Sequence, residues 1–182
     1  MTVRLQYRFE TGQTYVYERR AKMVSRRPSG EEATGNVVAR QVWRVVENRP
    51  GLTILEATEE VTESLGPLAK YFPQFQKSRK LYLDECGFLP HPGEDYPTLS
   101  AFPGLLEESV EAAESWSLVE QAPNWDSPLE IAYFLDSLEG QMAVLSCQAG
   151  EKKDHRAIEI RGTFHFNVQQ GRLQHSLLLV EN

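Results

Sequence analysis

Residues 155–168 read HRAIEIRGTFHFNV, and this stretch shows the pattern that decides the fold. From Ile158 to Val168, the even-numbered side chains other than Gly162 are apolar, and the odd-numbered side chains are polar. Successive side chains of a β-strand point to opposite faces, so this alternation is typical of a strand with one buried face. We therefore expect an antiparallel sheet that has one face in contact with solvent.

The chain after this strand is expected to turn back at Gln170 and Gly171 and to form a hairpin. The predicted cross-strand pairs are Val168 with Leu173, Phe166 with His175, and Phe164 with Leu177. This register places the apolar side chains of both strands on one face. It also places His175 in the apolar row and His165 on the opposite face, so these two imidazoles are not expected to meet.

Three further hairpins follow from the same period-two pattern. In residues 5–17, Tyr15 and Tyr17 are expected to lie opposite Phe9 and Tyr7. The other two hairpins are residues 37–61, with a turn at 49–51, and residues 131–146, with a turn at 138–141 and a return through Met142, Val144 and Ser146.

Proline and glycine interrupt this pattern in residues 64–76 and 87–113. The first segment is expected to hold a single helical turn or a lid, and residues 105–114 of the second have helical propensity. The whole pattern predicts a mainly β protein with one domain over residues 1–182. Its architecture is expected to be a single curved antiparallel sheet or half-barrel meander with a short helical or loop cover.

The 182 residues include 26 acidic and 19 basic side chains, which gives a formal net charge of −7. An acidic chain has little general affinity for nucleic acid or for anionic membrane surfaces. No apolar run approaches the roughly 18 residues that a transmembrane helix needs, and the first ten residues alternate like a strand rather than a signal peptide. We therefore expect a cytoplasmic protein, or an envelope protein if a leader has been removed.

The sequence has no recognisable catalytic or metal-binding motif. Cys86 and Cys147 are expected to be free thiols in strands, because two cysteines without CxxC spacing form neither a disulfide framework nor a zinc site. The carboxylates Glu56, Glu59, Glu60 and Glu63 are expected to be solvated, because consecutive or alternate acids on a strand more often form a solvated face than an acid–base pair. An exposed hairpin end is expected for the basic residues Arg19, Arg20, Lys22, Arg26 and Arg27. No catalytic residue, metal or cofactor is therefore predicted.

Three short motifs follow one another along the chain. They are residues 9–17 (FETGQTYVY), residues 105–116 (LLEESVEAAESW) and residues 162–176 (GTFHFNVQQGRLQHS). Their order and spacing resemble a group of bacterial proteins of unassigned function that are related in shape to lipoprotein carrier and localisation factors. In those relatives the middle motif has prolines and a Gly-Asp pair, where this chain has Leu106, Ser109 and Ala113-Glu114. The resemblance implies an open, strongly curved sheet whose apolar concavity holds acyl chains in the better-known carriers, and usually an envelope location.

The expected function is non-enzymatic binding of a hydrophobic or amphipathic molecule, such as a lipid or acyl chain, on the concave face of the sheet. Strand parity assigns the ligand contacts to Tyr15, Tyr17, Trp43, Phe164, Phe166 and His175. One alternative is a protein–protein module, including a homodimer, that uses the apolar sheet face or its edges. A second alternative is an enzyme whose site is built from loop residues such as Asp84, Glu85, His91 and Asp95.

Overall fold

The computed structural model describes residues 2–26, 30–71, 78–90, 94–97, 99–100, 102–122, 125–153 and 156–181. Its elements, in chain order, are β1 (Thr2–Val3), β2 (Thr14–Arg26), β3 (Glu32–Arg49), β4 (Leu52–Leu65), the single 3-10 turn η1 (Ala69–Tyr71), β5 (Arg79–Leu83), β6 (Val110–Glu111), β7 (Ser115–Glu120), β8 (Leu129–Glu139), β9 (Met142–Lys153), β10 (Arg156–Asn167) and β11 (Arg172–Glu181).

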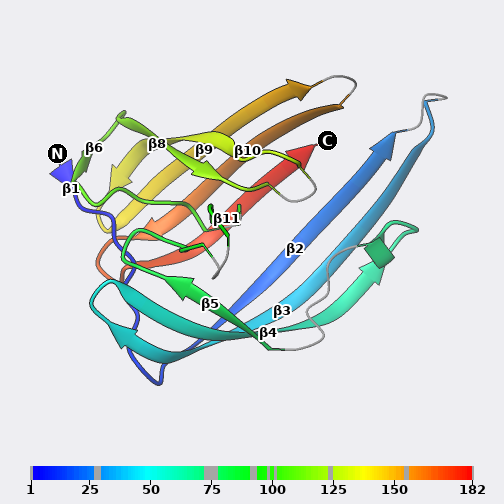
Figure 1. Ribbon diagram of the computed structural model, residues 1–182. Coiled ribbons are helices and arrows are strands. Elements are labelled where there is room, and N and C mark those ends of the chain that lie inside the picture. The colour runs from blue at the N-terminus through cyan, green and yellow to red at the C-terminus, as the bar shows by residue number, and fades with distance from the viewer. Residues whose placement is uncertain are drawn as a thin grey trace. The chain divides into compact units, whose positions relative to one another are not determined.

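The prediction of a mainly β, antiparallel fold is confirmed (Figure 1). The described strands belong to three sheets, and none of these sheets closes into a barrel. One sheet has the strand order β11-β10-β9-β8-β7, the second has the order β2-β3-β4-β5, and the third is the pair β1-β6. No helix in the described ranges is both long and apolar enough to span a membrane.

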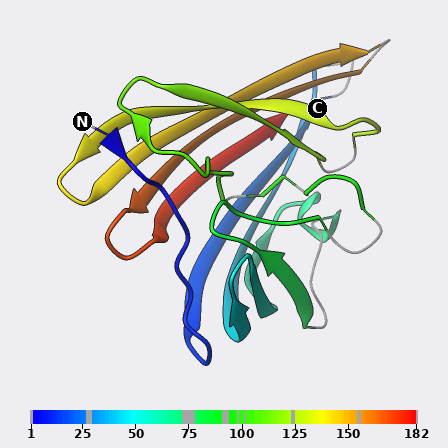
Figure 2. The ribbon, with the colours of Figure 1, turned by 60° about the vertical axis from the view of Figure 1, so that its left-hand side comes forward.

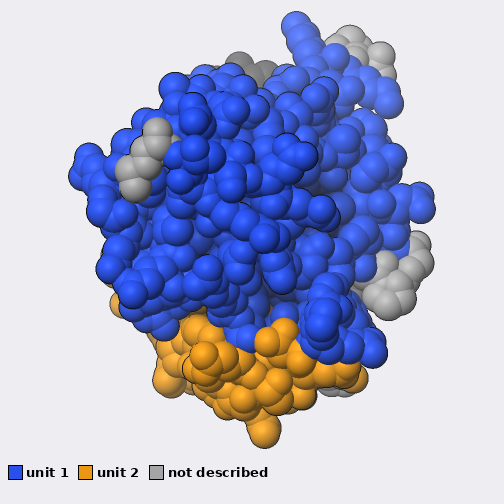
Figure 3. Space-filling view, turned by 90° about the vertical axis from the view of Figure 1, so that its left-hand side faces the viewer, with its two compact units in different colours: residues 1–9, 49–53, 82–182 blue, residues 10–48, 54–81 orange. Residues whose placement is uncertain are grey.

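The chain folds into two compact units, which Figure 3 colours separately. Unit 1 comprises residues 1–9, 49–53 and 82–182, and unit 2 comprises residues 10–48 and 54–81. The five-stranded sheet belongs to unit 1, whereas β2 and most of β3 and β4 belong to unit 2.

The five-stranded sheet of unit 1 has long, twisted strands (Figure 2) and one deeply buried face. On β10 the predicted alternation is confirmed, because the apolar side chains at even positions from 158 to 166 are at most 2% exposed. Gly162 interrupts this apolar row, since a Cβ there would lie 2.8 Å from the Cys147 sulfur. Burying each side chain of this size stabilises the fold by roughly 1.5–3 kcal/mol, so the row is a main source of the unit's stability.

The hairpin of β10 and β11 forms, but its predicted register is wrong. The two strands are joined by a four-residue turn, 168–171, and a bulge between His165 and Phe166 then shifts the pairing so that His165 lies opposite His175. A shift of one residue moves a strand's side chains to the other face. His175 is therefore exposed rather than in the apolar row, as is Leu177, and the two imidazole centroids are 5.8 Å apart.

The hairpin predicted for residues 131–146 also forms, as β8 and β9, with a different set of buried residues. The side chains of β9 that are buried are Ala143, Leu145 and Cys147, one position out of phase with the predicted Met142, Val144 and Ser146. A bulge between Leu135 and Ser137 on β8 accounts for the irregular pairing that the sequence pattern does not reveal.

The first predicted hairpin is wrong. Residues 4–10 form no strand, and β2 pairs with β3 instead, with Tyr15 opposite Trp43. The alternation itself is real, because the side chains of Leu5, Tyr7 and Phe9 are all buried. The backbone of this segment is held by irregular hydrogen bonds, such as that from the Tyr7 N–H to the Glu85 carbonyl at 2.7 Å. Alternate burial therefore does not require a sheet partner here.

β3 and β4 form the hairpin predicted for residues 37–61, and its turn includes Gly51 at a φ of +74°. The predicted apolar positions are buried at Val37, Ala39, Trp43, Val45, Leu55 and Ala57. Because Gly51 has no Cβ, it adopts the left-handed turn conformation without a steric penalty.

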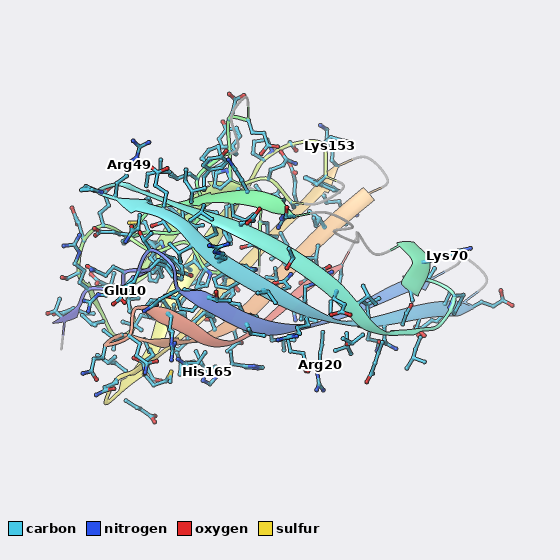
Figure 4. The ribbon with its side chains drawn as sticks, turned by 90° about the horizontal axis from the view of Figure 1, so that it is seen from below. Glu10, Arg20, Arg49, Lys70, Lys153 and His165 are labelled. Atoms are coloured by element: carbon cyan, nitrogen blue, oxygen red, sulfur yellow. The ribbon has the colours of Figure 1, made fainter. Side chains whose placement is uncertain are left out.

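The single helical turn predicted in residues 64–76 is present as η1, on which Lys70 lies (Figure 4). Gly35 on β3 permits its close approach, because a Cβ at this position would lie 2.4 Å from the Ala69 nitrogen. Residues 72–77 lie outside the described ranges. The alternative of a helix at 105–114 is not realised, since this segment contains only β6, which pairs with β1.

One carboxylate that was expected on the solvated face is buried. The Glu59 side chain of β4 is only 1% exposed, and it accepts hydrogen bonds from Arg19 at 2.9 Å and from Gln41 at 2.6 Å. Arg20, the next residue on β2, is exposed as expected (Figure 4). The Arg19–Glu59 ion pair therefore links β2 and β4 within unit 2.

Replacing Glu59 with Gln is expected to lower the free energy of unfolding by about 1–3 kcal/mol, because it removes the buried carboxylate charge that faces Arg19 and Arg79. Urea denaturation at pH 7 measures this loss, and Glu60→Gln, at an exposed position of the same strand, is the control. Equal midpoints for the two variants would contradict a stabilising role of the ion pair.

Candidate functional site

A pocket of about 250 Å³ lies in unit 1. Its described lining comes from three segments, namely residues 84–88, residues between 97 and 105, and residues 118–120 at the end of β7. The apolar side chains of the lining are Phe88, Pro97, Phe102, Leu105, Leu118 and Val119. Its polar side chains are Asp84, Cys86, Ser100 and Glu120. The pocket thus combines an apolar wall with a small number of polar groups, as small-molecule sites commonly do.

The first wall is a tight turn that follows β5. The Asp84 carboxylate accepts hydrogen bonds from the backbone N–H groups of Cys86, at 2.7 Å, and Gly87, at 3.0 Å. An aspartate that bonds the backbone two and three residues ahead is a common way to fix such a turn. The Asp84 N–H also donates to the Gly87 carbonyl at 2.9 Å, so the turn is closed from both sides.

The second wall is the irregular segment that ends at Leu105, and the hydrogen bonds that hold it include the following three. The Tyr7 hydroxyl donates to the Pro103 carbonyl at 3.0 Å, and the Trp116 indole N–H donates to the Gly104 carbonyl at 3.1 Å. The third bond joins the two walls, since the Leu105 N–H donates to the Cys86 carbonyl at 2.7 Å. Hydrogen bonds to backbone carbonyls therefore hold both walls in place.

The third side of the pocket is formed by β7, whose inward-facing residues are Trp116, Leu118 and Glu120. Glu120 is only 5% exposed, and its carboxyl accepts a hydrogen bond from the Tyr133 hydroxyl of β8 at 2.6 Å. Burial raises the pKa of Glu120 to about 7, and the bond from Tyr133 offsets part of that effect. Near neutral pH this carboxyl is therefore poised between its charged and uncharged forms.

The Tyr133 hydroxyl and the thiols of Cys147 and Cys86 remain protonated in the same pH range. Burial and the Glu120 charge raise the pKa of the Tyr133 hydroxyl, and burial also raises the pKa of the Cys147 thiol on β9 to about 12. In the wall, burial followed by the Asp84 charge raises the pKa of the Cys86 thiol to about 11. A thiol whose pKa is raised is a poor nucleophile, so these cysteines have the properties of inert structural residues.

Alkylation of Cys86 by iodoacetamide at pH 7.5 is expected to be about tenfold slower than alkylation of the unfolded chain, because the smaller thiolate fraction outweighs the gain in intrinsic nucleophilicity. Cys147, which is 4% exposed, is expected to react more slowly still. Peptide mass mapping over time measures both rates, and the protein in urea is the control. A Cys86 rate equal to that of the unfolded chain would contradict the described environment.

The six residues predicted to contact a ligand are not among those that line this pocket. Tyr15, Tyr17 and Trp43 lie in unit 2, where the rings of Tyr17 and Trp43 are in edge contact at 5.2 Å. In unit 1, Phe164 and Phe166 have no exposed surface and belong to the core. His175 is exposed on the outer row of β11.

Of the residues named for the alternative loop-built site, Asp84 lines the pocket, whereas Glu85 and Asp95 are not among its described lining residues. Asp84 fixes the turn, Glu85 forms an exposed ion pair with Arg4 at 3.3 Å, and Asp95 is exposed. His91 lies outside the described ranges. The expectation that His165 and His175 lie apart is wrong, but no group of three or more potential metal ligands occurs among the described residues.

Sequence reasoning missed Glu120, Tyr133 and Phe102 as site residues. A signal for Glu120 does exist, because it continues the alternation of Trp116 and Leu118 and is therefore an acid in an apolar row. The pairing of Glu120 with Tyr133 depends on the register of β7 and β8, which places Glu120 opposite Leu129. That register cannot be read from either strand alone.

Comparison of the chain with protein family models, with curated proteins and with solved structures found no match. The function is therefore inferred from the residues of the pocket.

Proposed function

We propose that this chain is a non-enzymatic binding protein that holds a small amphipathic molecule in the pocket of unit 1. The observation that carries the proposal is the presence of a buried carboxyl, Glu120, in a cavity whose other walls include Phe88, Phe102 and Leu118. Pockets with apolar walls and one or two directing polar groups are the usual form of small-molecule sites.

The volume of the pocket limits the size of the ligand. At about 250 Å³ the cavity is slightly smaller than the roughly 300–1,000 Å³ of typical ligand pockets. It suits a compact molecule better than a long acyl chain. The resemblance to lipoprotein carrier and localisation factors supports the same general class, a carrier of apolar ligands, with a smaller cargo.

The chemistry of the pocket does not favour nucleophilic catalysis by its thiol. Nucleophilic catalysis by a thiol requires a lowered pKa, whereas the pKa of Cys86 is raised to about 11. The Glu120 carboxyl is held by Tyr133, whose own pKa is also raised. The Glu120 carboxyl and the Tyr133 hydroxyl can form hydrogen bonds with a ligand without changing it covalently.

A direct test uses 2-phenylethanol as the probe, because its ring and hydroxyl match the two kinds of surface in the pocket. Isothermal titration calorimetry is expected to give a Kd of about 1 mM or tighter, which is reasonable for a ligand of this size. Phe88→Ala is expected to weaken binding about tenfold, since it removes one apolar wall. Tyr96→Ala removes an exposed ring that does not line the pocket and is expected to leave the Kd unchanged. Absence of binding, or equal effects of both substitutions, would contradict the proposal.

One observation favours self-association as a second candidate function. β11 is an edge strand of the five-stranded sheet, and Leu177, Leu179 and Val180 on it are 53%, 51% and 38% exposed. Exposed apolar edge strands often pair with another chain. Light scattering at 10–200 µM protein tests this idea, because a dimer that Leu179→Glu dissociates would support it and a monomer at all concentrations would exclude it.

A further inference from the structure

The polar groups that line the pocket of unit 1 are acidic or neutral. Asp84 and Glu120 provide two carboxyl groups, Cys86 and Ser100 provide a thiol and a hydroxyl, and the described lining contains no lysine, arginine or histidine. Arg4, whose charge acts on Cys86, forms an ion pair with Glu85 outside this lining. The charge of a ligand that the pocket selects is therefore expected to be positive or zero.

Glu120 is the residue that decides between these two possibilities. It is 5% exposed, and Tyr133 is the one hydrogen-bond donor to its side chain among the described residues. A carboxylate has two oxygens that together accept several hydrogen bonds, so the bond from Tyr133 leaves further acceptor capacity on the Glu120 side chain, which lines the pocket. Burying a carboxylate is costly unless a counter-charge compensates it, and none is present in the described lining.

The apolar walls also suit a cation. Phe88 and Phe102 are in edge-to-face contact, with ring centroids 5.8 Å apart and an angle of 83° between the planes. Both rings line the same cavity. Aromatic faces attract ammonium groups as well as apolar carbon, and the attraction is larger where water is excluded.

We propose that the pocket selects a compact organic ammonium ion, a primary amine on an aromatic or branched apolar body, with Glu120 as its counter-ion. The inference rests on the proposed function, because it names the ligand class for the same pocket. The ammonium group donates to Glu120, while the Tyr133 hydroxyl keeps its bond to the other side of the carboxyl. The apolar body of the ligand packs against Phe88 and Phe102.

Binding of such a cation is coupled to loss of a proton. In the empty pocket a fraction of Glu120 is protonated at neutral pH, since burial raises its pKa to about 7. The ammonium stabilises the carboxylate form, so the proton of Glu120 is released to the buffer and the amine keeps its own. The other titratable groups around Glu120 are Tyr133 from β8, Cys147 from β9, and Asp84 and Cys86 from the first wall. The raised pKa values of the tyrosine and the two thiols keep them protonated throughout.

The experiment compares phenethylamine with 2-phenylethanol, which share one carbon skeleton and differ in the ammonium and hydroxyl groups. Calorimetry at pH 7.5 is expected to show at least a tenfold preference of the wild-type protein for the amine. In Glu120→Gln the preference is expected to fall to within twofold, because glutamine can hydrogen-bond to either probe but carries no charge. Glu108→Gln, at an exposed position that does not line the pocket, is the matched control and is expected to keep the full preference.

A second readout separates a specific contact from the general attraction of a chain with a net charge of −7. Titrations at pH 7 in phosphate and in Tris, which differ in ionisation enthalpy, are expected to show release of about half a proton for each amine bound by the wild type. No release is expected for Glu120→Gln or for the alcohol.

The outcomes distinguish the two proposals. Binding of the alcohol and the amine with equal affinity would overturn the ammonium inference and leave the binding function standing. An amine preference that persists in Glu120→Gln would also overturn the inference, because another group would then be the counter-ion. Failure of both probes to bind would overturn the proposed function itself.

Discussion

Between pH 4 and pH 8, ionisation of Glu120 is expected to lower the free energy of unfolding of the wild-type protein by about 3 kcal/mol. Replacing Glu120 with Gln is expected to abolish this decrease. The pKa of this carboxyl is raised from 4.5 to about 7 by burial, so between these values the folded state binds more protons than the unfolded state. The free energy of unfolding then falls as the pH rises. The contribution of the group is fully present below pH 4.5 and is lost as the pH passes through about 7.

Glutamine at position 120 can still accept the hydrogen bond from Tyr133, but it does not ionise. Urea denaturation at intervals between pH 4 and pH 8 measures the effect as the difference between the wild-type and variant curves, in which the contributions of all other groups cancel. Glu130→Gln, at an exposed position of β8, is the control and is expected to follow the wild type. Parallel curves for the wild type and Glu120→Gln would show that Glu120 is not buried as described.

Replacing Phe164 with Ala is expected to lower the free energy of unfolding by about 3–5 kcal/mol, the usual cost of removing a fully buried aromatic ring. Phe164 has no exposed surface, and its ring packs 6.3 Å from that of Tyr133. The sequence pattern assigned Phe164 to a ligand-binding concavity, in which case the substitution would reduce binding and spare the fold. The structure places it in the core of unit 1, where the lost contacts leave a cavity.

The matched substitution is His175→Ala, because sequence parity assigned both residues to the same apolar row. His175 is exposed on β11, so its replacement is expected to change stability by no more than about 0.5 kcal/mol. Chemical denaturation at pH 7.5 measures both variants. A loss of less than about 1 kcal/mol for Phe164→Ala, or a larger loss for His175→Ala, would contradict the register of the β10–β11 hairpin.

The fold class could be predicted from sequence because alternation is a local property of each strand. The apolar row from Ile158 to Phe166 and the buried positions of β3 were identified correctly from their neighbours alone. Register was the main source of error. Bulges next to His165 and Leu135 shift the pairing of two hairpins by one residue, and nothing in the alternation itself reveals them.

The candidate site was harder to predict because its three walls are distant in sequence. Asp84, Phe102 and Glu120 each lie in a different segment, and backbone hydrogen bonds rather than a sequence motif bring these segments together. Two of the segments contain proline or glycine and have no regular structure, so periodicity gives no information about them. The one local signal was an acidic residue in the inward row of β7, and its meaning depends on Tyr133 from the next strand.

The most direct test of the binding function is a crystal structure of the protein in complex with 2-phenylethanol. The account predicts that the phenyl ring lies against Phe88 and Phe102 and that the hydroxyl lies within hydrogen-bond distance of Glu120. A ligand bound elsewhere, or a pocket filled by the protein's own side chains, would contradict it.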